Sequence, residues 1–365
     1  MKKIAIFGIR GYQIIYSGYE IFTEKLVNLS NKTDFFYILY TRSKYQKKTN
    51  NSANNFQISI MPTVRGKYLE TPFYAFFTTL NSLVKPINII LYLGTANTLF
   101  IFLQKLLNRK TIVNTAGIDW GKKRWSLFGR WYLFFCEKLT VWFADIIVCD
   151  SQSVLNYYKK KYHLKNLIFI PYGTDVKSRK SGKTLKKLKL ESNKYIYVVG
   201  RFSPENCQED VINAFKKIKT NFKCVIIGDS FYEDKYKSYL YKLAKNDKRI
   251  VFTGILNRNQ YEEIASNSYA YVETKSIGGT HPSLLEAMAF GKPVIAKDIE
   301  ENKEVVDKNG YLYSRAKPSS LTNQLEYLLI NVNNAQKKAL DGKKRVKTLY
   351  NWQLVIRNYE YIFNS

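Results

Sequence analysis

The stretch Ile277-Gly-Gly-Thr-His-Pro-Ser-Leu-Leu-Glu-Ala-Met-Ala-Phe-Gly-Lys-Pro-Val-Ile-Ala296 joins a glycine loop to a short helix and a buried strand. Two glycines open the loop, and Pro282 suits the first position of a helix. Gly291 and Pro293 end that helix, and the apolar run after them predicts a strand. A glycine loop that leads into a helix N-terminus offers backbone N–H groups and the positive end of the helix dipole. Together these groups favour a bound phosphate.

Glu286 allows two interpretations of this stretch. It lies one turn into the expected helix, and helical side chains lean toward the N-terminus, so its carboxylate could meet a ribose or sugar hydroxyl at the loop. Ser283-Leu-Leu-Glu286 also has the pattern of a capping box, in which Glu286 only satisfies the helix start. The stretch by itself leaves both readings open.

The composition indicates a folded protein of two domains. A chain of 365 residues is long for one domain and comfortable for two, and its 45% hydrophobic content supplies a sizeable core. The four cysteines show neither metal spacing nor a disulfide pattern, so we expect buried thiols of a reducing compartment. Two histidines exclude a histidine-rich metal site, and the absence of any Asp-x-Asp argues against a metal-bridged diphosphate. We therefore expect no metal and no other cofactor.

The formal charge of +29 favours an anionic partner, which could be nucleic acid, a membrane surface or a phosphorylated substrate. A solvated lysine-rich surface explains the charge equally well. No zinc finger, basic zipper or ribonucleoprotein signature accompanies it, so we expect no nucleic-acid partner. The most apolar span, 87–103, is interrupted by Gly94 and polar residues and falls short of the about 20 residues of a spanning helix. With no signal peptide after Lys2-Lys3, we expect a cytoplasmic protein, soluble or peripheral to the membrane.

Strand and helix patterns alternate along the whole chain, which predicts parallel α/β architecture. We expect an N-terminal Rossmann-like domain at 1–173, a basic linker at 174–194 and a second Rossmann-like domain at 195–345. A C-terminal helix at 346–365 should return to the first domain, and the two domains should face a cleft. Expected strands are 3–8, 35–39, 56–61, 87–93, 111–114, 146–150 and 167–171, then 195–200, 224–228, 250–254, 270–273 and 293–296. Expected helices are 19–29, 126–143, 154–162, 318–329, 335–350 and 352–363.

Two turns at predicted strand ends carry candidate phosphate ligands, because ligands of such sheets bind at the carboxyl ends of strands. Ser17 and Gly18 open the helix after the first strand, where backbone N–H groups could meet a phosphate. Gly18 could equally serve only for tight packing of strand on helix. Arg201 follows the strand 195–200, and its guanidinium fork suits a diphosphate better than the alternative of a surface ion pair.

A third stretch, Thr111 to Tyr132, interleaves basic and aromatic residues, including Trp125. This composition suits a phosphorylated or membrane-associated acceptor. A buried aromatic cluster with solvated lysines is the slightly favoured alternative. Asp119 is the one carboxylate of the loop that could help an acceptor hydroxyl lose its proton.

Taken together, these residues resemble the retaining glycosyltransferases of family 4, which have the GT-B fold. Gly278 to Val294 resembles that family's E-x7-E region, with Glu286 at the second glutamate, which binds the nucleotide ribose, and Gly278 at the first. A narrower resemblance is to the bacterial β-1,4-rhamnosyltransferase group, in which Gly-Gly-Thr replaces the first glutamate. The matching segments are 8–11, 16–20, 114–120, 123–125, 130–132, 144–145, 150–151, 170–173, 200–201, 204–206 and 278–280.

The resemblance implies a function. Such enzymes move L-rhamnose from dTDP-L-rhamnose to a polyprenyl-diphosphate-linked saccharide at the inner face of the cell membrane, with retention, during capsule and cell-wall polysaccharide synthesis. Other polysaccharide-assembly enzymes are possible partners. There are two alternatives. One is the same fold with another donor, such as a UDP-hexose, and the other is a non-catalytic scaffold that binds a sugar nucleotide or a membrane.

Site roles follow from the same comparison. The implied donor-binding residues are Ser17, Gly18, Arg201, Gly278, Gly279, Thr280, His281 and Glu286. The implied acceptor-side residues are Arg10, Glu20, Lys123, Arg124 and Trp125, with Asp119 as the catalytic candidate. The chain departs from the pattern at Ala116, where the group has an acidic residue and many members of the wider family have histidine. It departs again at Glu273 and Lys275, where histidines or small polar residues are expected.

Overall fold

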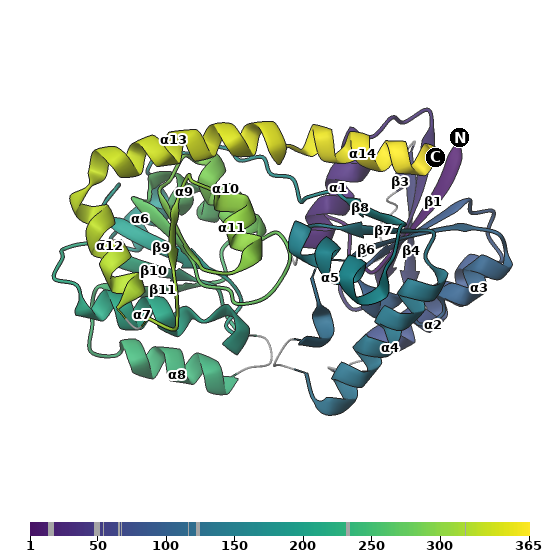
Figure 1. Cartoon of the computed structure of the whole chain (residues 1–365), viewed down its shortest axis with the longest axis horizontal. Helices are drawn as coiled ribbons and strands as arrows, with labels where there is room; N and C mark the ends of the chain where they lie inside the picture. The colour runs from purple at the N-terminus through teal and green to yellow at the C-terminus, as the bar shows by residue number, and fades with distance from the viewer. Residues whose placement is uncertain are drawn as a thin grey trace. The chain divides into compact units, whose positions relative to one another are not determined.

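The computed structural model describes residues 1–13, 18–46, 52–53, 55–64, 66, 68–115, 117–121, 125–230, 234–317 and 319–365. The chain forms two compact units (Figure 1). Unit 1 consists of residues 1–172 and 352–365, and unit 2 of residues 173–351. Each unit is built around a mainly or wholly parallel sheet with helices, which confirms the predicted α/β class with two Rossmann-like domains.

Unit 1 contains an eight-stranded sheet in the order β3-β4-β2-β1-β5-β6-β7-β8, parallel except for β3. Its strands are β1 (Lys2–Phe7), β2 (Phe35–Arg42), β3 (Ser52–Ala53), β4 (Phe56–Met61), β5 (Ile89–Leu93), β6 (Lys110–Thr115), β7 (Ile146–Cys149) and β8 (Leu167–Phe169). Its helices are α1 (Gly18–Leu29), α2 (Glu70–Leu83), α3 (Ile101–Leu106), α4 (Leu127–Phe143), α5 (Gln152–Tyr162) and α14 (Trp352–Asn364), with short 3-10 turns η1 (Thr95–Asn97) and η2 (Asp119–Gly121).

Strand β1 lies at the centre of this sheet and is buried on both faces. Ile4 and Ile6 belong to one hydrophobic cluster, which includes Trp352 and Tyr359 of α14. The alternate residues Ala5 and Phe7 belong to a second cluster on the opposite face. This arrangement follows from the period of two along a strand, and it explains why β1 is apolar throughout.

Unit 2 contains a six-stranded parallel sheet in the order β11-β10-β9-β12-β13-β14. Its strands are β9 (Tyr195–Val199), β10 (Lys223–Ile227), β11 (Ile250–Gly254), β12 (Ala270–Glu273), β13 (Val294–Lys297) and β14 (Tyr311–Tyr313). Its helices are α6 (Lys183–Lys187), α7 (Gln208–Lys217), α8 (Asp234–Ala244), α9 (Arg258–Asn267), α10 (Pro282–Ala289), α11 (Glu300–Val306), α12 (Ser320–Ile330) and α13 (Val332–Leu349), with one 3-10 turn, η3 (Pro204–Asn206).

Three details differ from the sequence expectation. The segment expected as a linker, 174–194, is part of unit 2, where the backbone N–H groups of Gly182 and Leu185 donate to Glu263 Oε1 at 2.9 and 3.0 Å. Helix α13 continues past residue 345 to Leu349, so the change of unit comes at residue 352. Strands β3 and β14 were not expected, because two or three residues are too few for a periodic pattern to show.

Candidate functional site

The site predicted in unit 2 lies where the order of strands reverses. From β9 the chain passes to β10 and β11 on one side of the sheet, and then to β12, β13 and β14 on the other. The loops that leave β9 and β12 at their carboxyl ends are therefore neighbours, and ligands of open α/β sheets bind in the crevice at such a point. Hydrogen bonds join the two loops: Ser276 donates from its N–H and its hydroxyl to Glu205 O, at 2.9 and 2.8 Å.

Arg201 stands on the β9 side of this crevice and is exposed. Its carbonyl accepts hydrogen bonds from Asn206 Nδ2 at 2.6 Å and from Gln208 Nε2 at 2.9 Å, so the turn that carries it is fixed from within. The turn after β10 also approaches closely: a Cβ at Gly228, whose φ is +138°, would lie 2.0 Å from Gly200 O. The backbone contacts of this turn therefore hold the exposed residue Arg201 in place.

The capping-box alternative for Ser283 and Glu286 does not hold in the structure. Helix α10 has His281 at its N-cap and Pro282 in its first turn, and no side chain caps it. Ser283 Oγ instead donates to Glu273 Oε2 at 3.0 Å. The helix start does not use Glu286, because Pro282 already removes one of the N–H groups that a cap would satisfy.

Glu286 forms an ion pair with Arg258, the first residue of α9. Arg258 also contacts Glu262 Oε1 at 2.8 Å through its Nε and donates to Asp175 O at 3.2 Å. Although burial opposes the charge on Arg258, Glu286 raises the pKa of its guanidinium above the usual value. Arg258 thus orients the Glu286 carboxylate, a role that sequence reasoning missed because nothing in the local pattern links residues 28 positions apart.

A buried charged cluster lies at the carboxyl end of β12. Lys275 Nζ contacts Glu273 Oε2 at 2.9 Å and donates to Ser283 Oγ at 2.8 Å. Tyr271 donates its hydroxyl to Glu273 Oε2 at 2.8 Å. Burial alone would raise the pKa of Glu273, but Lys275 and His281 lower it to about 2. The two residues at which the chain departs from the family pattern, 273 and 275, are therefore partners of each other.

His281 and the glycine pair complete this side of the crevice. His281 is buried, and its Nδ1 lies 2.8 Å from Asn302 Oδ1, while Asn302 Nδ2 donates to Lys297 O at 2.9 Å. Asn302 Oδ1 thus faces the ring as an acceptor, so Nδ1 carries the proton. Burial lowers the pKa of His281. Gly278 lies against the ring, and Gly279 and Thr280 are buried, so the expected donor loop is tightly packed.

Unit 1 has its own reversal of strand order, between β1 and β5. Gly8 (φ +111°) ends β1, and a Cβ there would lie 2.3 Å from Leu93 O at the end of β5. Arg10 and Glu20, both predicted on the acceptor side, are brought together: the Arg10 N–H donates to Glu20 Oε1 at 2.9 Å. Glu20 is buried, and in this structure its carboxylate supports the turn.

Gly18 begins α1 and packs against Tyr172. A Cβ at Gly18 would lie 3.2 Å from the Tyr172 ring, whose hydroxyl donates to Gly18 O at 3.1 Å. The contact agrees with the packing interpretation of this glycine. Ser17, the other residue predicted to meet a phosphate here, lies outside the described residues.

The loop between β6 and α4 carries Asp119 and Trp125. Asp119 begins the turn η2, and Trp125 contacts Tyr68 with ring centroids 6.4 Å apart. The neighbouring Trp120 donates from Nε1 to the buried Glu137 Oε2 at 3.0 Å, and Glu137 Oε1 accepts from Tyr157 at 2.7 Å. Trp120 and Trp125 are thus partly buried by these contacts, whereas Phe128 and Trp131 of the same stretch are exposed, so the stretch is not a buried aromatic cluster throughout. Ala116, Lys123 and Arg124 lie outside the described residues.

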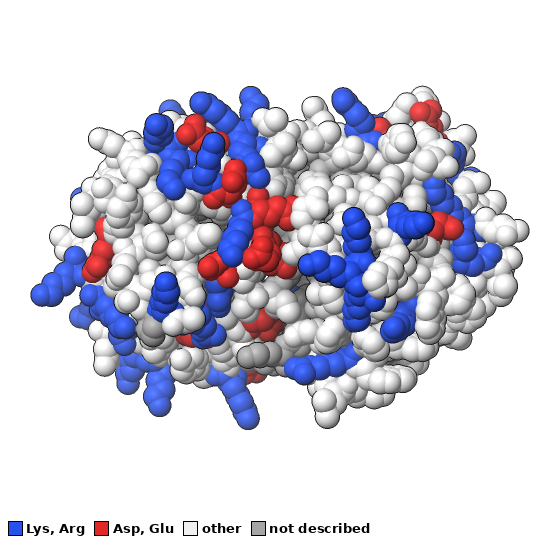
Figure 2. All heavy atoms as spheres, viewed as in Figure 1, with Lys and Arg blue, Asp and Glu red and all other residues white. Residues whose placement is uncertain are grey.

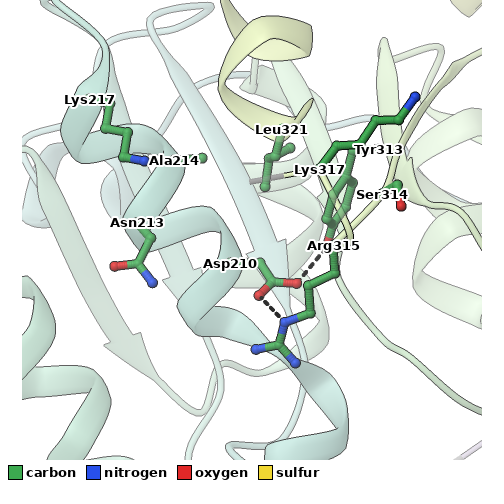
Figure 3. Close-up of a pocket in the computed structure, with 9 residues that line it drawn as sticks. All are labelled: Asp210, Asn213, Ala214, Lys217, Tyr313, Ser314, Arg315, Lys317 and Leu321. Carbon is green, nitrogen blue, oxygen red and sulfur yellow. Dashed lines mark hydrogen bonds and ion pairs between the residues drawn. The ribbon is translucent and has the colours of Figure 1, made fainter. Parts of the chain in front are cut away.

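A separate cavity of about 350 Å³ lies in unit 2 between α7 and the loop after β14 (Figure 3). Asp210 accepts from the Tyr313 hydroxyl at 3.1 Å and pairs with Arg315 Nε at 3.1 Å. Figure 3 shows Lys317 extending away from this group. None of the residues predicted from sequence lines the cavity. Over the ranges that the structure describes, no three His, Cys, Asp or Glu side chains gather as metal ligands.

Comparison with known proteins identifies similar domains and folds. Residues 181–345 match the family model described as glycosyl transferases group 1, and residues 1–175 match a domain of unknown function, DUF1972. The uncharacterized glycosyltransferase MJ1069 of Methanocaldococcus jannaschii is 27% identical over 286 residues, which cover 73% of this chain and 72% of that protein.

Solved structures share the fold at low sequence identity. Sucrose-phosphate synthase from Thermosynechococcus elongatus superimposes with a TM-score of 0.82 at 15% identity, covering 100% of this chain and 98% of that one. HepE of Anabaena in complex with UDP-glucose gives 0.80 at 13% identity, with both chains fully covered. WaaG, a glycosyltransferase involved in lipopolysaccharide biosynthesis, gives 0.73 at 12% identity, covering 96% and 97%. Residues 181–345 thus match the glycosyl transferases group 1 family, and the whole chain has the GT-B fold of solved glycosyltransferases.

Proposed function

We propose that the chain transfers a sugar from a nucleoside-diphosphate donor to a polyprenyl-diphosphate-linked saccharide, with retention at the anomeric carbon, in surface polysaccharide synthesis. The best candidate donor is dTDP-L-rhamnose, on the resemblance of the Gly278-Gly279-Thr280 loop and its surroundings to the rhamnosyltransferase group of family 4. The observation that carries the proposal is the crevice between the loops after β9 and β12, which holds Arg201 on one side and Glu286 near the other.

In this proposal each side of the crevice binds one part of the donor. The Arg201 guanidinium pairs with the diphosphate, since its fork matches two phosphate oxygens. The backbone N–H groups of Gly279 and Thr280 add to that site, and His281 closes it from behind. Glu286, oriented by Arg258, accepts hydrogen bonds from the pentose of the nucleotide, through the 3′-hydroxyl of dTDP or through the 2′- and 3′-hydroxyls of UDP. Protein cations and the helix dipole, without a metal or other cofactor, meet the charge of the leaving group.

The acceptor is proposed to bind in unit 1, with Asp119 close to the hydroxyl that reacts. Arg10, Glu20, Lys123, Arg124 and Trp125 form the proposed acceptor side, and Ser17 and Gly18 contribute backbone N–H groups. The acceptor hydroxyl attacks the anomeric carbon on the face from which the phosphate departs, and the departing phosphate oxygen takes the proton. The protein positions the reactants and stabilises charge. On this route the residue at position 116 does not have to transfer a proton, so alanine can stand there.

A UDP-hexose donor is the second candidate. It is supported by the Anabaena protein HepE, whose structures contain UDP or UDP-glucose and share this fold. The two candidates would share the diphosphate contact at Arg201. They differ in the transferred sugar and also in the nucleoside, since dTDP contains thymine and 2′-deoxyribose where UDP contains uracil and ribose. The sugar and the nucleoside are therefore the parts to be found by experiment.

A donor screen tests the proposal. Purified protein is incubated with dTDP-L-rhamnose, UDP-glucose and UDP-galactose, together with a synthetic polyprenyl-diphosphate-linked saccharide, and the released nucleotide is measured. We expect release from one donor to depend on the acceptor. Nucleotide binding without transfer or hydrolysis of any donor would instead indicate a non-catalytic scaffold.

The proposed location is the inner face of the cell membrane, where a lipid-linked acceptor resides. The formal charge of +29 would draw the protein to anionic lipid. Association with other polysaccharide-assembly enzymes is part of the same proposal. Charge-driven binding must weaken with salt, so vesicle association that is unchanged between low and high ionic strength would contradict it.

A further inference from the structure

Helix α2 in unit 1 turns apolar side chains to solvent. Phe73, Phe76 and Leu80 are each more than 40% exposed, and Val84 after the helix is 85% exposed. The spacing of three and four residues places these side chains on one stripe. A helix on the surface of a soluble domain normally shows solvent its polar side, so this pattern is reversed.

Helix α4 repeats the reversed pattern with larger rings. Phe128 is 65% exposed, Trp131 62% and Trp142 64%. Trp131 stacks on Phe135, with centroids 5.7 Å apart and planes at 4°, and on Phe128 at 6.4 Å. These stacks stiffen a row of rings on the outside of the domain.

The exposed stripes belong to one surface. Phe76 contacts Phe100 just before α3, and Phe102 of α3 contacts Phe143 at the end of α4. At the other end, a Cβ at Gly129 of α4 would lie 3.3 Å from the Tyr68 ring, just before α2. We call Phe73, Phe76, Phe128, Trp131, Phe135 and Trp142 the aromatic face. Contiguous exposed apolar surface of this extent marks an interaction site.

Charge on the three helices is one-sided. Their two carboxylates are buried in ion pairs, Glu70 with Arg42 at 2.6 Å and Glu137 with Lys161 at 3.2 Å. Their cations are partly exposed: Arg130, Lys138 and Lys105, of which Lys105 forms an ion pair with Asp145 at 2.5 Å. Figure 2 shows the surface over the N-terminal end of α4, at the lower right, as mostly white. The surface therefore offers aromatic rings edged by positive charge.

We infer that the aromatic face docks on an anionic lipid bilayer, with its rings in the headgroup region and its lysines and arginine at the lipid phosphates. Tryptophan and phenylalanine combined with Lys and Arg is the composition that interfacial helices use to lie on membranes. Lys138 is an example of a cation beside aromatic rings. Its Nζ lies 4.8 Å from the centroid of the Tyr162 ring and 5.6 Å from that of the Phe134 ring, an arrangement that lets a lysine cover aromatic surface while its charge reaches the lipid phosphates. Across the part of the chain that the structure describes, no helix is long and apolar enough to cross a membrane.

A bilayer fits this face better than a second copy of the chain. Two copies of the same face would bring their cations together, whereas anionic lipid complements them. The inference rests on the proposed function for the lipid-linked acceptor, and it assigns the membrane contact to named side chains.

Vesicle flotation tests the inference with two variants of the full chain. Phe128→Ser/Trp131→Ser removes two rings from the aromatic face, and Tyr361→Ser removes an equally exposed ring from α14 as the control. With vesicles of phosphatidylglycerol and phosphatidylcholine, we expect the double variant to bind about tenfold more weakly or worse, because each buried ring contributes strongly to partitioning. The control should float like the wild type, and vesicles without anionic lipid should bind the wild type less.

A second readout follows the tryptophans directly. Lipids brominated near the headgroup should quench wild-type fluorescence more than that of Trp131→Phe, because Trp131 of the docked protein lies where the headgroups meet the acyl chains. Equal flotation of wild type and double variant would overturn the inference. The inference would also be overturned if the wild type does not bind vesicles but forms a dimer, and if the double variant does not form that dimer. Nucleotide release from donor in the absence of lipid should be the same in both proteins, so loss of transfer activity with intact vesicle binding would count against the proposed function alone.

Discussion

His281 Nε2 lies 2.7 Å from the point that a Cβ on residue 278 would occupy. The space into which a side chain on residue 278 would extend is therefore filled by the imidazole, which Asn302 holds from its other nitrogen at 2.8 Å. A glutamate at 278, as in the wider family that the sequence resembles, cannot fit until His281 moves. Glycine at 278 and histidine at 281 form one packing unit.

The pair predicts a measurable coupling. Gly278→Glu should destabilise the chain and weaken nucleotide binding, because the new side chain displaces a buried ring. His281→Ala should cost stability by leaving a cavity, yet in the double variant Gly278→Glu/His281→Ala the two costs should partly cancel. We expect a coupling free energy of about 1 kcal/mol or more from chemical denaturation of all four proteins. Strictly additive effects would show that the contact has no energetic consequence.

Arg258 should stabilise unit 2 and also orient Glu286. Arg258→Met leaves Glu286 and the buried Glu262 without this partner, which should cost about 1–3 kcal/mol of unfolding free energy. Donor nucleotide affinity should fall with it, measured by calorimetric titration. Lys194→Met, which removes an exposed pair with Glu191, is the matched control and should leave both quantities unchanged. If Arg258→Met binds the nucleotide as tightly as wild type, then the Glu286 carboxylate that Arg258 orients does not contribute to ribose binding.

The Glu273 carboxylate predicts an acid-sensitive fold. Its pKa falls from an ordinary 4.5 to about 2 in the folded chain, because Lys275 and His281 outweigh burial. A lowered folded pKa gives stability that is fully present above pH 4.5 and is lost as pH falls toward 2, on the order of 3 kcal/mol in total. Glu273→Gln should therefore be less stable than wild type at pH 7, and the difference should shrink between pH 4.5 and 2. A difference that stays constant across that window would contradict the lowered pKa.

The four cysteines should resist modification in the native protein. All are buried free thiols, and burial raises the pKa of Cys136 and Cys149 to about 12. Since the thiolate is the reactive form, a thiol reagent should label them slowly at pH 8 and label all four after unfolding. Rapid labelling of any one in the native protein would show that its surroundings open.

Much of the architecture follows from local pattern. The alternating strands and helices predict both sheets, because parallel strands buried on both faces read as apolar runs, as β1 does. The strand ends also place Arg201 and the Gly278 loop at the reversal of strand order. The helix boundary at Pro282 follows from proline chemistry alone.

What local pattern cannot supply is contact across the chain. A capping role for Glu286 stayed open in the sequence because its partner, Arg258, begins a different helix. Glu273 and Lys275 are two departures from the family pattern, and the sequence does not show that they are linked. Their ion pair appears only in the folded chain, at the end of β12. Of the aromatic face, only Phe128 and Trp131 lie in the stretch whose composition suits a membrane-associated acceptor. The rest reads as core until the fold shows which side faces solvent.

Acceptor-dependent release of nucleotide tests the central claim most directly. Wild type and Glu286→Ala are each given the nucleotide sugar that the donor screen selects, with and without the polyprenyl-diphosphate-linked saccharide. The account predicts that wild type releases nucleotide faster when the acceptor is present, and that Glu286→Ala loses at least about tenfold in kcat/KM through weaker donor binding. Equal release by the two proteins, or release from no donor at all, would contradict it.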